Sequence, residues 1–143
     1  MRSGMVGLGP QAALVVAESF SVDAWQRVHL HNLVDGVAVR RLPSRHRLCG
    51  CAKVWALPPG THQGRLRIVD PDGETLSIGA SNGLSPAPGL TSCTVLTAFN
   101  GVMFRTAGRH ELVLDVDGST VATLPLDVAV GRNGGASLET PPD

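Results

Sequence analysis

Apolar and polar residues alternate along most of the chain. In one stretch, for example, Leu112, Leu114 and Val116 alternate with Glu111 and Asp115. Successive side chains of a β-strand leave opposite faces, so a period of two predicts a strand with one buried face. No window of the length of a helix shows a convincing period of 3.6. The pattern therefore predicts an all-β protein.

Turn sequences separate the alternating runs. They include the Asn-Gly and Asp-Gly pairs at 35–36, 72–73, 82–83, 100–101 and 117–118, and both pairs tolerate the positive φ of hairpin turns. Short strands between such turns are typical of a β-sandwich or barrel. We expect seven or eight strands, at 12–20, 27–39 (broken at 35–36), 47–56, 62–70, 74–79, 92–105 (as one strand or two), 109–116 and 119–130.

The length of 143 residues fits one domain. The first eleven residues are rich in glycine and show no period, and the stretch from Gly131 onward is poor in apolar residues. Such segments cannot bury enough surface to order themselves. We therefore expect a flexible N-terminal arm at 1–11, a sandwich at 12–130 and a disordered C-terminal tail at 131–143.

Charge and composition narrow the possible partners and the compartment. The chain has 12 basic and 12 acidic residues, 3% aromatic residues and no tyrosine. A balanced charge gives no general attraction to nucleic acid or to an anionic membrane, so we expect neither as a partner.

The three cysteines do not make a disulfide framework, and no signal-peptide core is visible at the N-terminus. We expect a cytoplasmic protein with reduced thiols.

Four segments in a fixed order resemble a family of small, uncharacterised bacterial proteins that is known as a domain of unknown function. The segments are AESF at 17–20, QRVHLHNLVDGV at 26–37, PPGTH to IVDPDG at 58–73, and FRTAGRH at 104–110. The resemblance covers roughly residues 13–131 and implies an immunoglobulin-like β-sandwich. It brings no activity and no catalytic residues. The chain departs from the pattern at Glu18-Ser19, where the family has Cys-Asp, and at His62 and His110, where it has an aromatic residue.

Two histidines and two cysteines form a weak candidate metal site. Each pair, His29 with His31 and Cys49 with Cys51, is spaced so that both side chains share one face of a strand. If the two strands were neighbours, the four side chains could approach tetrahedral zinc coordination. However, Cys-x-Cys along a strand is not the usual zinc spacing, and a free cysteine commonly packs as a small hydrophobic residue. We expect no cofactor.

A nucleophile-elbow pattern, G-x-S-x-G, occurs at 79–83 with Ser81 at its centre. Pro86 and Pro88 follow, so the helix that this motif requires cannot begin there. An enzyme would need a triad built from distant residues, such as Ser81 with His62 or His110. We expect these histidines instead to cap the sandwich through hydrogen bonds to nearby backbone. The prediction is that the protein is not an enzyme and has no catalytic residues.

We therefore expect a protein-interaction or assembly module that binds another protein or itself through a sheet edge. The strand that ends at Val130 is the preferred edge. The predicted contact residues are Arg40, Arg41, Ser81, Asn82 and Leu84. The two arginines suit a phosphate or an acidic partner, although a solvated loop is the favoured explanation for them. The other three lie in a Gly/Pro-rich recognition loop at 79–91. Trp25 and Trp55 are expected to pack. The alternative is a small-ligand or metal-binding protein that uses His29, His31, Cys49 and Cys51.

Overall fold

The computed structural model describes residues 9–131, which form ten strands and no helix. None of these residues belongs to a helix that could span a membrane. Most of the expected arm and tail lies outside the described residues. The strands are β2 (Gln11–Val22), β3 (Val28–Leu33), β4 (Gly36–Val39), β5 (Ser44–Trp55), β6 (His62–Val69), β7 (Thr75–Ile78), β8 (Asn82–Leu84), β9 (Cys93–Phe104), β10 (Gly108–Val116) and β11 (Ser119–Val130).

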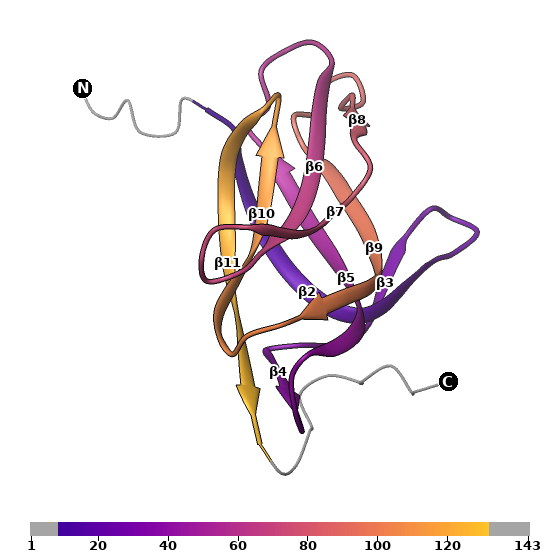
Figure 1. The fold of residues 1–143 in the computed structure, drawn as a ribbon. Coiled ribbons are helices and arrows are strands. Elements are labelled where there is room, and N and C mark those ends of the chain that lie inside the picture. Colours follow the sequence, from indigo (N-terminus) through magenta and orange to yellow (C-terminus); the bar gives the residue numbers. More distant parts are fainter. Residues whose placement is uncertain (1–8, 132–143) are drawn as a thin grey trace.

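The strands form two sheets that pack face to face (Figure 1). One sheet has the order β3-β2-β5-β9, and the other has the order β4-β11-β10-β6-β7 with β8 also paired to β6. The runs β2-β5-β9 and β11-β10-β6 correspond to the A-B-E and G-F-C orders of immunoglobulin domains. The predicted immunoglobulin-like sandwich is confirmed, with ten strands instead of seven or eight.

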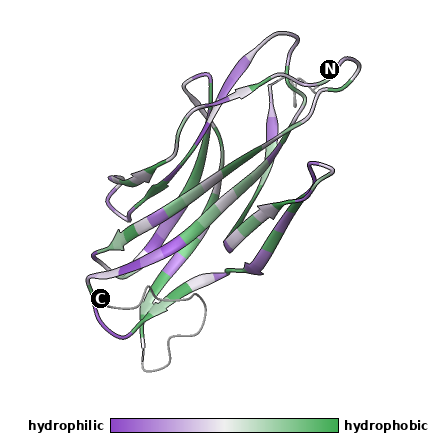
Figure 2. Cartoon of the chain, turned by 90° about the vertical axis from the view of Figure 1, so that its right-hand side faces the viewer, coloured by the Kyte–Doolittle hydropathy of each residue, from purple (hydrophilic) through white to green (hydrophobic). Residues whose placement is uncertain are grey.

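The core lies between the two sheets and is built from the alternating apolar residues. Leu112 and Leu114 of β10 are fully buried, as are Leu66 of β6 and Val95 and Phe104 of β9. Figure 2 shows the alternation as bands of hydrophobic and hydrophilic residues along the long strands. One face of each sheet is therefore committed to packing, and the opposite face is available for contacts.

The expectation that the strand ending at Val130 forms a sheet edge is wrong for the end of that strand. β11 lies between β10 and β4, and its last four residues pair in parallel with β4, from Asp127 opposite Gly36 to Val130 opposite Val39. The cause is the break at 35–36, where the chain leaves one sheet and joins the other. The stretch at 27–39, which was expected to be broken at 35–36, thus becomes β3 and β4. The edges among the described strands are β3, β9, β4, the β7–β8 side and residues 119–126 of β11, which pair only with β10.

Candidate functional site

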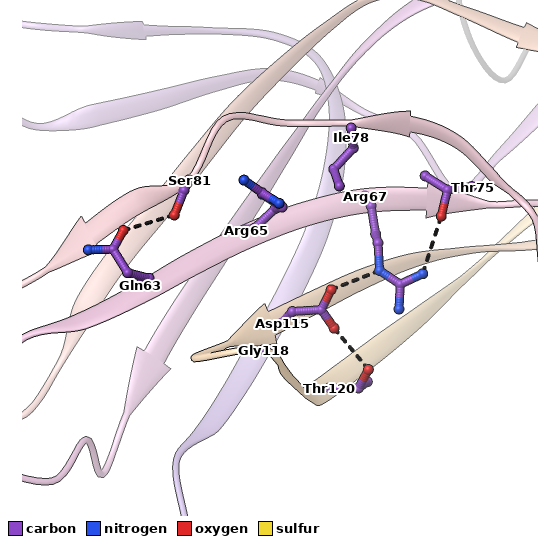
Figure 3. Close-up of a pocket in the computed structure, with 9 residues that line it drawn as sticks. All are labelled: Gln63, Arg65, Arg67, Thr75, Ile78, Ser81, Asp115, Gly118 and Thr120. Atoms are coloured by element: carbon purple, nitrogen blue, oxygen red, sulfur yellow. Dashed lines mark hydrogen bonds and ion pairs between the residues drawn. The ribbon is translucent and has the colours of Figure 1, made fainter.

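A cavity of about 440 Å³ lies on the outer face of the six-stranded sheet. β6 supplies its floor, because Gln63, Arg65 and Arg67 point outward while Leu66 and Ile68 point into the core. β7 and the β10–β11 hairpin supply its walls (Figure 3). We call it the β6 cavity. It is lined by Gln63, Arg65, Arg67, Thr75, Ile78, Ser81, Asp115, Gly118 and Thr120.

A hydrogen-bonded ion pair organises one side of the β6 cavity. The Nε of Arg67 donates to Oδ2 of Asp115 at 2.8 Å, and the Thr120 hydroxyl donates to Oδ1 at 2.9 Å. A further nitrogen of Arg67, Nη1, reaches the Thr75 hydroxyl at 3.4 Å. Partial burial alone would raise the pKa of Asp115, but the hydrogen bonds and the charges of Arg67 and Arg65 outweigh it and lower that pKa. Asp115 is therefore ionised and has both oxygens engaged.

Arg65 is the remaining cation of the cavity. Asp115 stands directly opposite Arg65 in the register of β6 and β10, yet its carboxylate pairs diagonally with Arg67. The Arg65 side chain is exposed and makes no hydrogen bond or ion pair with any residue in 9–131. On its other side, the Ser81 hydroxyl donates to Oε1 of Gln63 at 2.8 Å. Figure 3 shows Arg65 between these two bonded groups.

A second polar cluster closes the adjacent end of the sandwich. Nδ1 of His62 lies 2.7 Å from Oδ2 of Asp117, and Nε2 lies 2.8 Å from the carbonyl oxygen of Pro58. A carboxylate and a carbonyl oxygen both accept hydrogen bonds, so this arrangement favours the ring with both nitrogens protonated. These bonds raise the pKa of His62, and the bond from His62 lowers the pKa of Asp117. The prediction that His62 caps the sandwich through backbone is confirmed. His110 behaves similarly, since its Nδ1 lies 3.1 Å from the Gly108 carbonyl oxygen.

The structure does not join Ser81 to His62 or to His110. Ser81 donates to Gln63, and both nitrogens of His62 are taken by Asp117 and Pro58. His110 is fully buried against Phe104, with ring centroids 5.1 Å apart. Within residues 9–131, no hydrogen bond joins Ser81 to either histidine.

The four candidate metal ligands lie on strands that do not touch. β2 separates β3 from β5, because Ala17 pairs with Leu33 on one side and with Cys49 on the other. Two strand spacings put the histidine and cysteine strands roughly 10 Å apart, whereas zinc ligands lie within about 2.3 Å of the metal. The described part of the chain holds no group of three or more His, Cys, Asp or Glu side chains that could bind a metal. Burial raises the pKa of the Cys49 and Cys51 thiols.

The predicted contact residues divide into three groups. Arg40 and Arg41 are exposed and follow β4, away from the β6 cavity. Ser81 lines the cavity, and Asn82 is half-buried and donates to the Ala80 carbonyl oxygen. Leu84 is 2% exposed and packs in the core, because β8 turns it inward. It therefore offers no surface to a partner in the folded chain.

A two-stranded ribbon, formed by the end of β2 with β3, extends away from the body of the sandwich (Figure 1, right). Its turn is held by Asp23, whose carboxylate accepts from the backbone nitrogens of Trp25 and Arg27, from Nε of Arg27 and from Nε2 of His29, all within 2.9 Å. Trp25 is 75% exposed and lies under the Arg27 guanidinium. The expectation that Trp25 packs is wrong, because the turn carries it beyond the reach of either sheet.

β3 is exposed on both faces. Leu30 is its only half-buried residue, and Leu33 is 64% exposed. One edge of β3 pairs with β2, and no other described strand pairs with the opposite edge. The ribbon thus combines free backbone hydrogen-bonding groups with exposed apolar side chains.

The pattern of apolar and polar residues along the sequence revealed only part of the candidate site. Arg65 and Arg67 alternate with Leu66 and Ile68, so their outward direction could be predicted from the sequence, but the pairing of β6 with β10 that brings Asp115 to them could not.

The sequence model of a family of unknown function, DUF6941, matches residues 12–129 of this chain. The chain belongs to the DUF6941 family. This confirms the resemblance found in the sequence. No curated protein matches the DUF6941 chain.

Solved structures resemble the DUF6941 chain at a distance. A β-glucosidase from Listeria innocua aligns over 90% of this chain and 17% of its own, with 10% identity and a TM-score of 0.45. The alkylpurine DNA glycosylase AlkC from Pseudomonas fluorescens aligns over 82% of this chain and 30% of its own, with 11% identity and a TM-score of 0.41. An immunoglobulin-like protein from Pseudomonas aeruginosa aligns over 86% of this chain and 98% of its own, with 14% identity and a TM-score of 0.39. The DUF6941 chain thus spans less than a third of the two enzymes.

Proposed function

We propose that this DUF6941 chain is a non-enzymatic protein-interaction module that docks a protein partner on the β2–β3 ribbon. The observation that carries the proposal is the exposure of β3 on both faces, together with its unpaired edge. An extended segment of a partner would continue the four-stranded sheet through backbone hydrogen bonds, and side-chain contacts would supply specificity.

The composition of the ribbon supports this role. Natural proteins commonly protect an edge strand with lysine, proline or a bulge, and the β3 sequence VHLHNL contains neither of those residues. Exposed tryptophan is typical of interfaces, where it contributes more than most residues, and Trp25 stands at the tip. The cytoplasm is the proposed compartment, since Cys49, Cys51 and Cys93 are all free thiols.

The hydrogen bonding of the histidines supports a non-enzymatic role. A catalytic His–Asp pair keeps one ring nitrogen available for a nucleophile. In this chain the corresponding nitrogen, Nε2 of His62, is hydrogen-bonded to the carbonyl oxygen of Pro58. The histidines His29 and His31 bond to Asp23 and Ser21 on the ribbon itself.

Site-specific photo-crosslinking in the native host tests the proposal. A photoreactive phenylalanine analogue replaces Trp25 in one variant and Thr123, an exposed residue of β11 on the other sheet, in the control. We expect a discrete protein adduct from position 25 and none from position 123. The adduct mass distinguishes a second copy of the chain from a different protein. Absence of an adduct at position 25, or equal adducts at both positions, would contradict the proposal.

A further inference from the structure

A half-open cavity of about 300 Å³ lies between two loops at one end of the sandwich. One loop joins β5 to β6, and the other joins β8 to β9. We call it the proline pocket. No charged side chain belongs to its described lining, which is formed largely by Leu57, Pro58, Pro59, Pro86, Pro88 and Leu90. Its volume is at the lower end of the range of roughly 300–1,000 Å³ that is usual for small-molecule sites, so it suits a single large side chain.

Backbone hydrogen bonds hold the proline pocket in shape. The amide of Leu57 donates to the Thr91 carbonyl oxygen at 3.2 Å and joins the two loops, and the amide of Leu90 donates to the Ala87 carbonyl oxygen at 2.9 Å. Gly89 adopts the positive φ of 83° within this second turn, and the proline rings fix φ at their own positions. A pocket that is already formed pays little ordering entropy when it binds.

The surface of the proline pocket fits an aromatic ring. Leu90 is 62% exposed at the rim, and Pro58, Pro59 and Pro88 are exposed as well. Proline-rich segments bind against aromatic side chains in several classes of peptide complex. The described lining holds prolines and no aromatic residue, so an aromatic side chain from outside would complete the contact.

The same chain carries such a side chain on the β2–β3 ribbon. Trp25 is the most exposed large hydrophobic residue of the described chain, at 75%. The Asp23 carboxylate, which accepts from the backbone nitrogens of Trp25 and Arg27, holds the turn that presents it. The indole is therefore displayed in a fixed place and is not covered by either sheet.

Trp25 and the proline pocket lie at opposite ends of β2. Gln11, the first residue of β2, pairs with Trp55, and Leu57 of the pocket follows two residues later. Trp25 follows the last residue of the same strand. The twelve residues of β2, at a rise of about 3.3 Å each, separate the two features by roughly 40 Å along the strand. The indole therefore cannot fill the pocket of its own chain.

We propose that Trp25 of one copy docks in the proline pocket of a second copy of this chain. This pairing rests on the proposed function, in which the ribbon is the docking element, and it names the partner of the ribbon tip. Each copy offers one tip and one pocket at opposite ends. Two copies related by a two-fold axis would therefore exchange both contacts, which closes the assembly at a dimer.

The area of these contacts determines how stable the dimer is. A tryptophan buries up to about 250 Å², so a side chain that is 75% exposed has about 190 Å² left to bury. Two reciprocal contacts, counted on both surfaces, bury about 800 Å². Stable interfaces of standard size bury about 1,200–2,000 Å². We therefore expect a weak dimer that depends on concentration, and a test that traps it covalently.

Photo-crosslinking of the purified whole chain provides this test. The donor copy carries a photoreactive phenylalanine analogue at position 25 together with Leu90→Glu, which places a charge in its own pocket. The acceptor copy is wild-type chain labelled with ¹⁵N. We expect an adduct between position 25 and labelled peptides that contain residues 57–60 or 85–91. Leu90→Glu in the acceptor should lower the yield about tenfold, because docking would then bury an unpaired carboxylate.

Matched variants separate the pocket and the indole from general effects. Ile78→Glu in the acceptor, the same change at an exposed residue of β7 outside the pocket, should leave the yield unchanged. Ala87→Glu, at a second exposed lining residue, should repeat the loss. An excess of unlabelled Leu90→Glu chain keeps Trp25 and should suppress the adduct, whereas Leu90→Glu/Trp25→Ala should not. The amide spectrum of each variant shows whether it is folded.

Several outcomes would overturn the proposal. Adducts that map outside residues 57–60 and 85–91 would show that the tip docks elsewhere. Equal yields from the Leu90→Glu and Ile78→Glu acceptors would show that the pocket is not used. If the crosslink in the native host joins position 25 to a different protein while the purified chain forms no adduct, docking on the ribbon stands and the second copy is the wrong partner. Absence of an adduct in both experiments would contradict the proposed function as well.

Discussion

His62 and Asp117 form a hydrogen-bonded ion pair, 2.7 Å from Nδ1 to Oδ2, that joins the start of β6 to the β10–β11 turn. The backbone supports the same link, because Gln63 N donates to Oδ1 of Asp117 and Asp117 N donates to the Gln63 carbonyl oxygen. Asp117 has a φ of 53° and Gly118 a φ of 82°, as the hairpin turn between β10 and β11 requires. The pair closes the end of the sandwich next to the β6 cavity.

The first prediction concerns the pH dependence of stability. The pKa of His62 is raised in the folded chain. The stabilisation that protonated His62 gives to the fold is therefore complete below its pKa in the unfolded chain, about 6.5, and is lost as the pH rises through its pKa in the folded chain. The pKa of Asp117 is lowered, so its contribution is present above the unfolded value of about 3.9 and is lost as pH falls through the folded value. Stability from this pair should therefore be greatest between about pH 4 and 6.5.

Urea unfolding at a series of pH values measures this effect. His62→Asn should flatten the decline above pH 6.5, because the group that titrates there is gone. His31→Asn is the matched control, since His31 is exposed on the ribbon and bonds only to Ser21 among the described residues. A wild-type curve that is flat between pH 6 and 8, or one that both variants flatten equally, would contradict the assignment.

The second prediction is that the two glycines of the G-x-S-x-G pattern differ in how far substitution by alanine destabilises the chain. A Cβ on Gly79 would overlap the Thr97 side chain at Cγ2, whereas a Cβ on Gly83 would meet nothing within 4 Å. Gly79→Ala should therefore destabilise the chain by about 1–3 kcal/mol through overpacking, and Gly83→Ala should stay within about 0.5 kcal/mol of wild type. Chemical denaturation of both variants measures the difference. Equal stabilities would show that β7 does not approach β9 this closely.

Gly79 and Gly83 also show what could and could not be predicted from the sequence. The pattern at 79–83 could be rejected as a nucleophile elbow because prolines follow it, but the reason for Gly79 lies in Thr97, a residue on another strand. Alternation predicted the strands and the core rows, since it depends only on neighbours along the chain. Contacts between strands depend on sheet order, which alternation does not encode.

Sheet order also explains the other differences between expectation and structure. The turn at 35–36 was correctly placed, but whether the chain continues in the same sheet or crosses to the other one depends on packing across the core. The crossing to β4 covers the end of β11 and leaves β3 as an exposed edge. In the same way, the sequence showed Arg65, Arg67 and Asp115 as outward-facing residues, and only the register reveals which arginine the carboxylate binds.

The third prediction concerns zinc. β2 lies between β3, which carries His29 and His31, and β5, which carries Cys49 and Cys51. Untagged protein purified without chelator should therefore contain well under one equivalent of zinc. The double variant Cys49→Ser/Cys51→Ser should contain the same amount as wild type. Elemental analysis beside native mass spectrometry measures both. One equivalent of zinc in the wild type that is lost in the double variant would show that the strands are arranged differently.

The fourth prediction concerns the turn of the ribbon. Asp23 accepts four hydrogen bonds, of which the one from His29 contributes most to lowering its pKa to about 2. The Asp23 carboxylate therefore stabilises the turn fully above a pH of about 3.9, the pKa of an aspartate in an unfolded chain, and this stabilisation is lost only as the pH falls toward 2. Asp23→Ala should release the turn, because the amides of Trp25 and Arg27 lose their acceptor.

Hydrogen–deuterium exchange measures this local opening. In Asp23→Ala, amides of residues 24–28 should exchange about tenfold faster, as expected when hydrogen bonds to a charged acceptor are lost, while amides of β5 and β10 keep their wild-type rates. Asp35→Ala, which removes an exposed acid from the turn after β3, should leave residues 24–28 unchanged. Because docking on the ribbon requires an ordered turn to present Trp25, Asp23→Ala should also weaken the crosslink from position 25. Unchanged exchange in Asp23→Ala would mean that strand pairing alone orders the ribbon, and that the carboxylate does not hold its tip.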